Sequence, residues 1–594
     1  MPAVVWFKRD LRWRDHAPLA AAAAHDEALA LYVIEPAWLA SPSFDAQHLA
    51  FTLACLAELR EQLAKRGLPL LVRVGEAVEV LAQVQREHGM RFLLSHEETG
   101  EGWSYARDKA VAAWCRAQGV AWLEWPQTGV VRRLRERTGW ASRWNARMNA
   151  PEVAMPAGFS GVRAELGDLP TLASLGVGAS RPLPEAGEAA AWAVLHDFLG
   201  GRGRDYRRAL SSPLTAADGC SRLSPHLAFG TVSMRCVHQA TEAAIAHTPD
   251  RALSHALRGF AGRLRWHCHF MQKLEDEPQI EVRNFASVCD GLRENDFDRE
   301  RFEAWCEGRT GYPMVDACMR SLRATGWLNF RMRAMLVSFA AYHLWLHWRE
   351  PGLFLARQFL DFEPGIHWSQ MQMQSGTTGI NTLRIYSPTK QARDHDPHGI
   401  FIRRWLPELA QVPLEHLAQP WLMDAATQRA SGCVIGRDYP SPVVDERAAA
   451  HHAKERLYAL RRDPVVRQEA DNIQQRHGSR RSGLKPSTRQ RFTALTLDYP
   501  APAVERRILE TEGRASPAIA ARLVQLAQAL RRLTDHDLEE TASTRLLVMA
   551  ARLASAGIGL RQACRAAVVD ALSDDHDTVL ALDEVVRAVV GDED

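Results

Sequence analysis

The 594-residue chain has no cysteines at metal-binding spacing. Its ten Cys residues are scattered, and Cys-x-x-Cys occurs nowhere in the sequence. A zinc site, an iron–sulfur cluster and a secreted disulfide framework all need closely spaced cysteines, so we expect no metal centre and no disulfides. Scattered reduced thiols are typical of a cytoplasmic protein, and we predict that location.

Long apolar runs and a large charge excess are missing too. No segment approaches the length of a membrane span, so no membrane partner is expected. The N-terminus passes from Val4-Val5-Trp6-Phe7 directly into charged residues, unlike a signal peptide. The formal net charge is only +2, so any nucleic-acid-binding face must be local. A chain of this length is too long for a single hydrophobic core, which suggests about three domains.

Strands and helices alternate in the first part of the chain. Short apolar runs predict strands at 3–7, 28–34, 68–74 and 91–95. Helical patterns separate these runs, and the alternation predicts a Rossmann-like α/β domain over residues 1–130, with a parallel sheet covered by helices on both faces. This fold serves many functions, so the domain alone indicates only a scaffold.

A linker is predicted over residues 131–190. It begins with four arginines, at positions 132, 133, 135 and 137, and then becomes rich in Pro, Gly and Ala. We interpret these arginines as a solvated face, with contact to DNA as the alternative. The pattern is helical over 191–478, which predicts a large all-α domain.

Three dense runs stand out in the helical part, at 311–320, 325–333 and 361–390. Apolar, aromatic and cationic residues alternate in them at helical spacing, interrupted by Gly and Pro. A pocket for a flat apolar ring with an anionic tail has this composition. A buried helical core with satisfied arginines is the alternative.

These runs resemble the FAD-binding domain of the photolyase/cryptochrome family. The segments Glu363-Pro364-Gly365-Ile366-His367 and Gln370–Gly376 are similar to a divergent bacterial branch of it. The resemblance implies FAD as cofactor, UV-damaged DNA as partner and a monomeric protein. The usual antenna residues are not matched around Trp103–Asp108, so an antenna chromophore stays undecided.

The resemblance also implies the flavin contacts. Tyr206 and the Ser221–Ser224 run fall where the phosphates are held, although Ser224-Pro225 alone would indicate only a helix N-cap. Asp361 and Glu363 would meet the ribityl chain and ring edge, with Arg331 and Arg333 balancing charge. His367 falls where the family places the residue facing flavin N5, usually Asn. The implied contacts are Tyr206, Ser221, Arg222, Leu223, Ser224, His267, Arg331, Asp361, Phe362, Glu363 and His367.

Lesion binding departs from the family pattern. Where the family has Glu, Trp and Arg, this chain has Arg263, Trp266 and His267. Trp266 is implied to stack on the lesion, while another group, Glu281 or a nearby amide, must hydrogen-bond the lesion in place of the missing Glu. His267 and His269 are two residues apart and so face different sides of a helix, which argues against a metal pair.

The family's set of electron-transfer tryptophans, which reduce the flavin, is also incomplete in this chain. The family passes electrons along three Trp residues, of which Trp305 and Trp348 match two. The position nearest the flavin holds Met371, which does not carry an electron hole, so the usual route is broken. Trp368 is either a substitute or a core aromatic.

Cations and aromatics are interleaved from Arg384 to Trp405. This pattern fits a surface that clamps phosphates and stacks on bases, or else an ordinary surface loop. We predict DNA contacts from Lys390, Arg393 and Arg403.

Residues 484–594 resemble the C-terminal part of a MoxR-branch AAA+ ATPase of the NorQ/CbbQ type. Apolar Ile519, Leu523, Leu526 and Leu530 recur at helical spacing and predict a small all-α module. Nothing upstream has the Gly-x-x-x-x-Gly-Lys-Ser/Thr loop that cradles phosphates, so the module cannot hydrolyse ATP unaided. It either docks a protein or is the remnant of a gene fusion, and we favour the second.

The resemblance implies a blue-light-driven photolyase that splits cyclobutane pyrimidine dimers by electron transfer from reduced FAD. Trp266, Trp305, Trp348 and His367 would serve the reaction. The adjacent histidines of (6-4) photolyases are absent, which favours the cyclobutane lesion. A (6-4) photolyase and a cryptochrome-like photoreceptor are the alternatives. The missing Glu and the broken Trp route support the photoreceptor.

Overall fold

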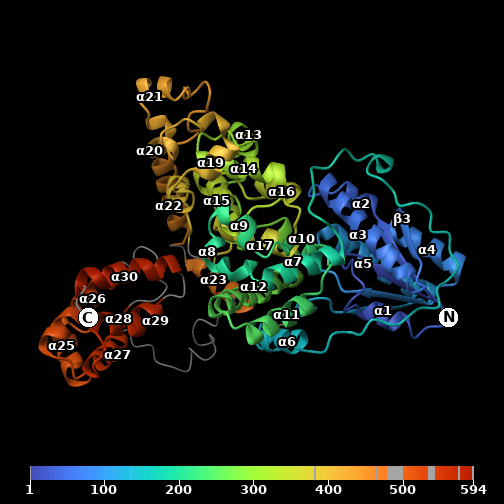
Figure 1. Cartoon of the computed structure of the whole chain (residues 1–594), viewed down its shortest axis with the longest axis horizontal. Helices are drawn as coiled ribbons and strands as arrows, with labels where there is room; N and C mark the ends of the chain where they lie inside the picture. The colour runs from blue at the N-terminus through green and yellow to red at the C-terminus, as the bar shows by residue number, and fades with distance from the viewer. Residues whose placement is uncertain are drawn as a thin grey trace. The chain divides into compact units, whose positions relative to one another are not determined.

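A five-stranded parallel sheet opens the chain, blue in Figure 1. Its strands are β1 (Ala3–Phe7), β2 (Ala28–Ile34), β3 (Leu70–Val74), β4 (Phe92–His96) and β5 (Ala121–Trp125). They lie in the order β3-β2-β1-β4-β5, with every pair parallel. The sheet confirms the predicted α/β class. β5 was not predicted, because its exposed Leu123 and its Glu124 interrupt the apolar pattern.

Each face of the sheet has its own core. Helices α1 (Ala17–Ala22) and α3 (Ala46–Ala64) pack on one face, and α4 (Ala77–His88) and α5 (Gly102–Gln118) on the other. β1 and β2 are buried along their whole length, as central parallel strands must be. The strand order reverses between β1 and β4, and ligands of such sheets bind outside the carboxyl ends at this switch point.

The computed structural model describes residues 2–134, 137–379, 383–461, 464–477, 499–532, 542–572 and 576–591. Arg135, residues 380–382 of the third dense run and the predicted start of the C-terminal module, 484–498, lie outside these ranges. The chain divides into two compact units, Met1–Arg481 and Ser482–Asp594. None of the described helices has the length and apolar content to cross a bilayer.

The helical part of the first unit is built around α12 (Arg251–Asp276), the 26-residue helix marked in Figure 1. Helix α17 (Pro364–Ser375) packs against it at Gly365, where an added Cβ would lie 2.5 Å from the Met271 Cα. Glycine at this position therefore permits the close approach of the two helices. The site elements around them are α8 (Tyr206–Ala209), α10 (Ser224–Ala228), α15 (Phe330–Ser338) and α16 (Arg349–Gln358).

The predicted linker contains a helix of its own. Helix α6 (Trp140–Met148) buries Trp140, Trp144 and Met148 against α11 (Met234–His247) and α12. The rest of the segment runs along the α/β domain, where Gly161 forms a bridge with Ala28. The domain boundaries themselves stay predictions.

The second unit is all helical, as predicted. Its core joins α25 (Pro502–Thr511), α26 (Pro517–Arg532), α27 (Thr544–Ser555), α28 (Leu560–Cys564) and α30 (His576–Val590). Arg531 forms an ion pair of 2.7 Å with the buried Glu505, which also accepts a hydrogen bond of 2.7 Å from the Thr544 hydroxyl. A buried carboxylate satisfied in this way fixes how α25, α26 and α27 meet.

Candidate functional site

The turn before α10 carries the predicted phosphate-binding run. Arg222 has a left-handed backbone conformation, with φ of 61°, which is unfavourable for a residue with a Cβ and is often found at ligand sites. Its guanidinium lies 3.9 Å from the centroid of the Trp327 ring. Burial lowers the pKa of Arg222, and the Asp361 carboxylate opposes this shift. The turn therefore presents a cation close to Asp361.

Tyr206 is buried at the start of α8. Burial raises the pKa of Tyr206 to about 12, and the nearby Arg263 guanidinium opposes this shift. Arg263 stands at the position where the resemblance expects a glutamate. Here that position lies near the predicted phosphate-binding tyrosine.

Asp361 is the buried anion of the site. Its Oδ2 accepts a hydrogen bond of 2.7 Å from Nη2 of Arg333, whose guanidinium lies 4.0 Å from the Phe359 ring centroid. The other oxygen, Oδ1, is buried and has no hydrogen-bond partner in the part of the chain that the structure describes. An unsatisfied buried oxygen is costly, so this atom marks a place where a ligand can donate a hydrogen bond. Arg331 lies in the first turn of α15, two residues before Arg333.

His367 is neutral and fixed in orientation. Its Nε2 donates to the Gly352 carbonyl oxygen at 2.9 Å, which leaves Nδ1 as an acceptor. Burial lowers the pKa of His367 to about 4. Phe362 and Trp368 flank the imidazole, with ring centroids at 5.1 and 4.8 Å.

A cavity of about 630 Å³, open solvent included, separates the carboxyl ends of the strands from α10 and α12. Glu363 lines it, with the nearest cation, Nη2 of Arg9, at 3.8 Å. Burial raises the pKa of Glu363 to about 7, although Arg9 opposes the shift. His267 lines it too, and its buried Nδ1 has no partner among the described residues. Burial lowers the pKa of His267 to about 4.

Arg9 was missed at the sequence level. It donates to the carbonyl oxygens of Ala228 at 2.9 Å and Phe362 at 2.7 Å, and so connects the end of β1 to the flavin segment. The available signal was its position directly after a buried strand, where parallel sheets bind ligands.

The tryptophans considered for electron transfer all lie in the helical core. Trp348 and Trp368 lie with ring centroids 6.0 Å apart, and Trp348 Nε1 donates to Asn284 Oδ1 at 2.7 Å. Trp305 is fully buried in the same core, with the Phe354 ring centroid at 5.8 Å. An added Cβ at Gly352 would lie 2.8 Å from Trp368 and 3.4 Å from Met371, so these two side chains pack on the same point of α16.

The predicted DNA-binding residues differ in exposure. Trp266 is 43% exposed on α12, and Lys390 and Arg393 are exposed on α18 (Pro388–His395). Arg403 of α19 (Ile400–Trp405) instead donates to the carbonyl oxygens of His398 and Val412, which occupies two of its nitrogens. Glu281, suggested above as the replacement carboxylate, accepts from the Gly102 backbone N–H at 2.7 Å. It therefore faces the α/β domain.

These residues fit a flavin dinucleotide. Asp361 offers an unpaired buried acceptor for a ring N–H, and Arg222 offers a cation at a turn that suits a diphosphate. Tyr206 and Ser224 lie at the same group of short helices. The implied set is thus compatible with FAD on the chemistry of its donors and acceptors.

A second cavity, of about 780 Å³ with open solvent, lies at the carboxyl ends of β1, β2 and β4. Its lining includes the aromatic side chains Trp6, Tyr32, Trp38 and Trp103. Glu101 also lines it, accepts from the Ser43 hydroxyl at 2.7 Å and has a pKa raised by burial to about 7. The site offers flat apolar walls with a few polar groups, as small-molecule pockets do.

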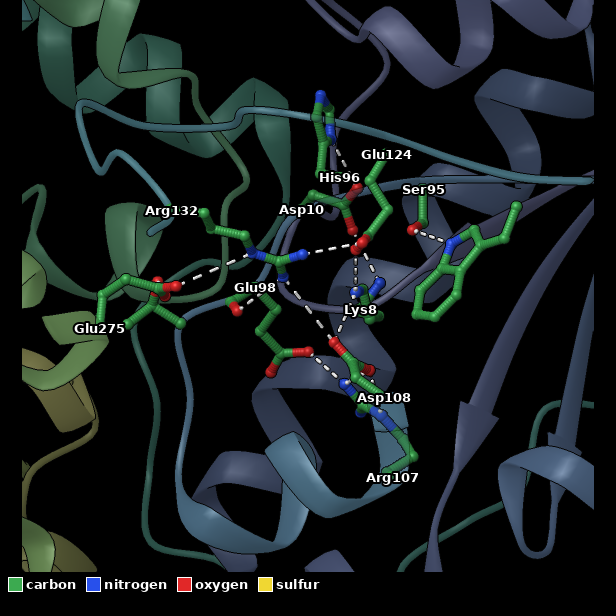
Figure 2. A network of polar contacts seen from close by, with 12 residues as sticks. Lys8, Asp10, Ser95, His96, Glu98, Arg107, Asp108, Glu124, Arg132 and Glu275 are labelled. Carbon is green, nitrogen blue, oxygen red and sulfur yellow. Dashed lines mark hydrogen bonds and ion pairs between the residues drawn. The ribbon is translucent and has the colours of Figure 1, made fainter. Parts of the chain in front are cut away.

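A network of charges borders this cavity (Figure 2). Arg107 donates to Glu35 at 2.8 Å and to Glu98 at 2.6 Å, while Lys8 lies 3.4 Å from Asp108. The network continues through Arg132, which pairs with Glu124 at 2.8 Å and reaches Glu275 of α12 at 4.0 Å (Figure 2). It joins the sheet, the linker and the helical part.

Two of the linker arginines therefore do not fit either predicted role. Arg132 lies in this network, and the Arg137 side chain is only 8% exposed beside Asp276, with Nε and Oδ2 at 3.2 Å. The solvated-face interpretation is wrong for both, and neither lies on an open DNA-binding surface. Arginine-rich composition does not reveal whether carboxylates from other segments will meet the side chains.

Comparisons with known proteins agree with this architecture. Residues 3–135 match the family described as DNA photolyase, and residues 260–459 match the FAD binding domain of DNA photolyase. Residues 505–589 match the CbbQ/NirQ/NorQ C-terminal family.

Similar curated proteins carry two kinds of name. The chain is 31% identical to the deoxyribodipyrimidine photo-lyase of Escherichia coli, over 75% of this chain and 96% of that protein. It is 30% identical to the cryptochrome DASH of Natronomonas pharaonis, over 75% and 98%. A solved bacterial class III photolyase from Agrobacterium tumefaciens is 26% identical, with a TM-score of 0.68 over 78% of this chain and 98% of that one.

Proposed function

Because this chain belongs to the photolyase/cryptochrome family and has its FAD-binding domain, we propose that it is a light-driven DNA photolyase that splits cyclobutane pyrimidine dimers. Trp266 carries the proposal: it is an apolar ring, 43% exposed, at the position that the family uses for stacking on the lesion. A photoreceptor that binds no lesion has no need of such an exposed indole.

The chain supplies binding and orientation. FAD, when bound and reduced, supplies the light-absorbing group and the electron that opens the dimer. Arg222 and Tyr206 hold the phosphates, and Asp361, fixed by Arg333, accepts from the ring. His367 stays neutral near pH 7, because burial disfavours its charged form. It therefore presents an acceptor rather than a positive charge.

UV-damaged DNA is the proposed partner. The dimer leaves the duplex and stacks on Trp266, at an unstacking cost of a few kcal/mol that is lower for a damaged pair. Lys390 and Arg393 neutralise neighbouring phosphates. Arg403, with two nitrogens on backbone carbonyls, positions the loop after α19 instead.

The test is a lesion count. Purified protein is loaded with FAD, reduced and illuminated with blue light together with UV-irradiated oligonucleotide, and both lesion types are counted before and after. Loss of cyclobutane dimers in the light but not in the dark supports the proposal. Loss of (6-4) products alone would identify the other enzyme, and loss of neither would reject repair.

A cryptochrome-like photoreceptor is the second candidate. The observation that favours it is Arg263, a cation near Tyr206 at the position where the family has a lesion-binding carboxylate. In that case the C-terminal unit would be the output, docking a protein. The lesion count separates the two candidates.

The second cavity is the proposed place for an antenna chromophore. Its aromatic side chains can pack against a flat ring. Glu101, whose pKa burial raises to about 7, can accept a hydrogen bond from a ring N–H. The absorption spectrum of the purified protein tests this proposal, because an antenna adds a band that FAD alone does not give.

A further inference from the structure

A group of cationic and imidazole side chains lies beside α12 and has no part in the proposed function. Its members are Arg137 from the loop before α6, His269 and Lys273 from α12, and His477 from the end of α23 (Pro464–His477). The exposed fractions are 8% for the Arg137 side chain, 6% for His269, 6% for Lys273 and 2% for His477. We call this group the cation cluster.

Lys273 is a buried ammonium without a counter-charge. Among the described residues it forms no hydrogen bond and no ion pair, and its Nζ lies 5.2 Å from the Phe270 ring centroid and 6.0 Å from that of Phe285. Lysines are almost never fully buried unless paired. Burial, and then the nearby Arg137, lowers the pKa of Lys273 to about 8.

The carboxylate beside Arg137 is Asp276. Asp276 Oδ2 lies 3.2 Å from Nε of Arg137, and Asp276 also accepts from Gln272 at 2.7 Å. A second acid, Glu277, pairs with Arg476 at 2.9 Å. Within the described part of the chain, Asp276 therefore serves Arg137, Glu277 serves Arg476, and no carboxylate pairs with Lys273.

Several donors of the cluster are unsatisfied. Nη1 of Arg137 donates to Nδ1 of His269 at 3.4 Å, which leaves the proton of that imidazole on Nε2. Nη2 of Arg137 and Nδ1 of His477 are buried, and neither has a hydrogen-bond partner among the described residues. Such atoms in a native structure call for a missing ligand, water or ion.

Aromatic rings border the cluster and lower its dielectric constant. Phe285 contacts His477 with ring centroids at 4.8 Å, and Trp140 contacts His269 at 6.0 Å. Trp266 also touches His269, at 5.2 Å, and is itself exposed. The cluster therefore lies next to the indole that we propose as the lesion-stacking group.

We propose that the cation cluster is a binding site for one phosphate-type oxyanion. The anion would accept hydrogen bonds from Lys273 and Nη2 of Arg137 and would supply the missing negative charge. A metal cation is excluded by the charge of the site. The phosphate comes either from the DNA strand whose lesion stacks on Trp266 or from a free small molecule. Only the first source rests on the proposed function.

The first arm of the test measures thermal unfolding of the full chain loaded with FAD. Phosphate is titrated against chloride at equal ionic strength and pH 7. The melting temperature of the natural protein should rise saturably with phosphate, and the Lys273→Met variant should bind phosphate at least tenfold more weakly. Lys109→Met is the matched control, because Lys109 is exposed and packs on Tyr105. Lys273→Arg keeps the charge and should keep the response.

The second arm identifies the source of the phosphate. Binding of UV-irradiated oligonucleotide is measured against salt concentration for the same variants. If the source is DNA, Lys273→Met lowers the salt slope by about 1 and free phosphate competes with the oligonucleotide. If the slope is unchanged while phosphate binds, the ligand is a free small anion.

The proposal is overturned if Lys273→Met cannot be distinguished from Lys109→Met in either arm. The ratio of flavin to protein absorbance shows that each variant is folded. Because neither arm uses light, a protein that repairs no lesion still gives an interpretable phosphate titration, so the two failures are distinguishable.

Discussion

Trp348 and Trp368 lie edge to face, with ring centroids 6.0 Å apart and planes at 66°. Trp368 in turn contacts His367 at 4.8 Å. The chain thus has a continuous aromatic contact from Trp348 to the predicted flavin neighbour, beside Met371.

We expect Trp368→Phe and Trp348→Phe each to slow flavin photoreduction by an external thiol markedly, because both interrupt this contact. Met371→Leu should have little effect, since a thioether does not carry the hole. Transient absorption should also lose the tryptophan radical band in Trp368→Phe. Equal rates for Trp368→Phe and the natural protein would assign Trp368 to the core alone.

Removing the Trp266 indole should weaken binding to dimer-containing oligonucleotide by about 1–3 kcal/mol, the range for a stacked base. Tyr105→Ala is the control, because this ring is 51% exposed on α5. Competition binding in the dark measures both. Unchanged affinity of Trp266→Ala would remove this residue from the DNA site.

Asp361→Asn should weaken FAD binding and lower the free energy of unfolding. The amide keeps the shape of the carboxylate but leaves Arg333 uncompensated, at a cost of roughly 1–3 kcal/mol. Asp438→Asn removes an exposed partner of Arg437 and should change the free energy of unfolding much less than Asp361→Asn does, because solvent screens exposed ion pairs. Urea unfolding and retained flavin absorbance measure both variants, and equal behaviour would contradict a role for the buried pair.

The free energy of unfolding should fall as the pH drops from 7 toward 5. Burial lowers the pKa to about 4 for His48, His226, His267, His343 and His367, and to about 3 for His96 and His477. Below pH 6.5 these histidines are protonated in the unfolded chain but stay neutral in the folded chain. Each group therefore lowers the free energy of unfolding by about 1.4 kcal/mol per pH unit.

Buried carboxyl groups act in the opposite direction. The pKa is raised to about 7 for Glu101 and Glu363 and to about 6 for Asp316, so the folded state binds these protons first and gains stability as the pH falls. These three strongly shifted groups are outnumbered by the seven histidines. Urea midpoints at pH 7.5 and 5.5 test the net sign, and a higher midpoint at pH 5.5 would contradict it.

A chain that stops at Arg481 should keep its flavin content. The second unit has its own core of α25–α30, and no predicted flavin contact lies in it. The ratio of flavin to protein absorbance should match that of the full chain. Loss of FAD from the shortened chain would show that the second unit is structural.

The sheet could be predicted because β1 and β2 are apolar on both faces. Strand β5 was missed because its sequence mixes Trp with Glu and shows no continuous apolar run. The predicted flavin residues rest on resemblance, and the Asp361–Arg333 pair agrees with the expected charge balance. The roles of Arg9 and Arg107 could not be predicted. Each depends on loops that meet only once the strands are aligned side by side.

Burial of charge was equally hidden from the sequence. Arg137 and Lys273 look like ordinary surface cations in the sequence, and their neighbours come from positions as distant as His477. The local sequence pattern predicts the helix that carries such a residue. It does not predict which distant segment of the chain will cover the side chain.

The Arg132 network links Glu124 of β5 with Glu275 of α12. Recombination between relatives at the end of the sheet domain would break this link and place mismatched charges at a partly buried junction. The sheet and α12 are therefore expected to be inherited as one block, and chimeric enzymes should be assembled with both taken from the same parent.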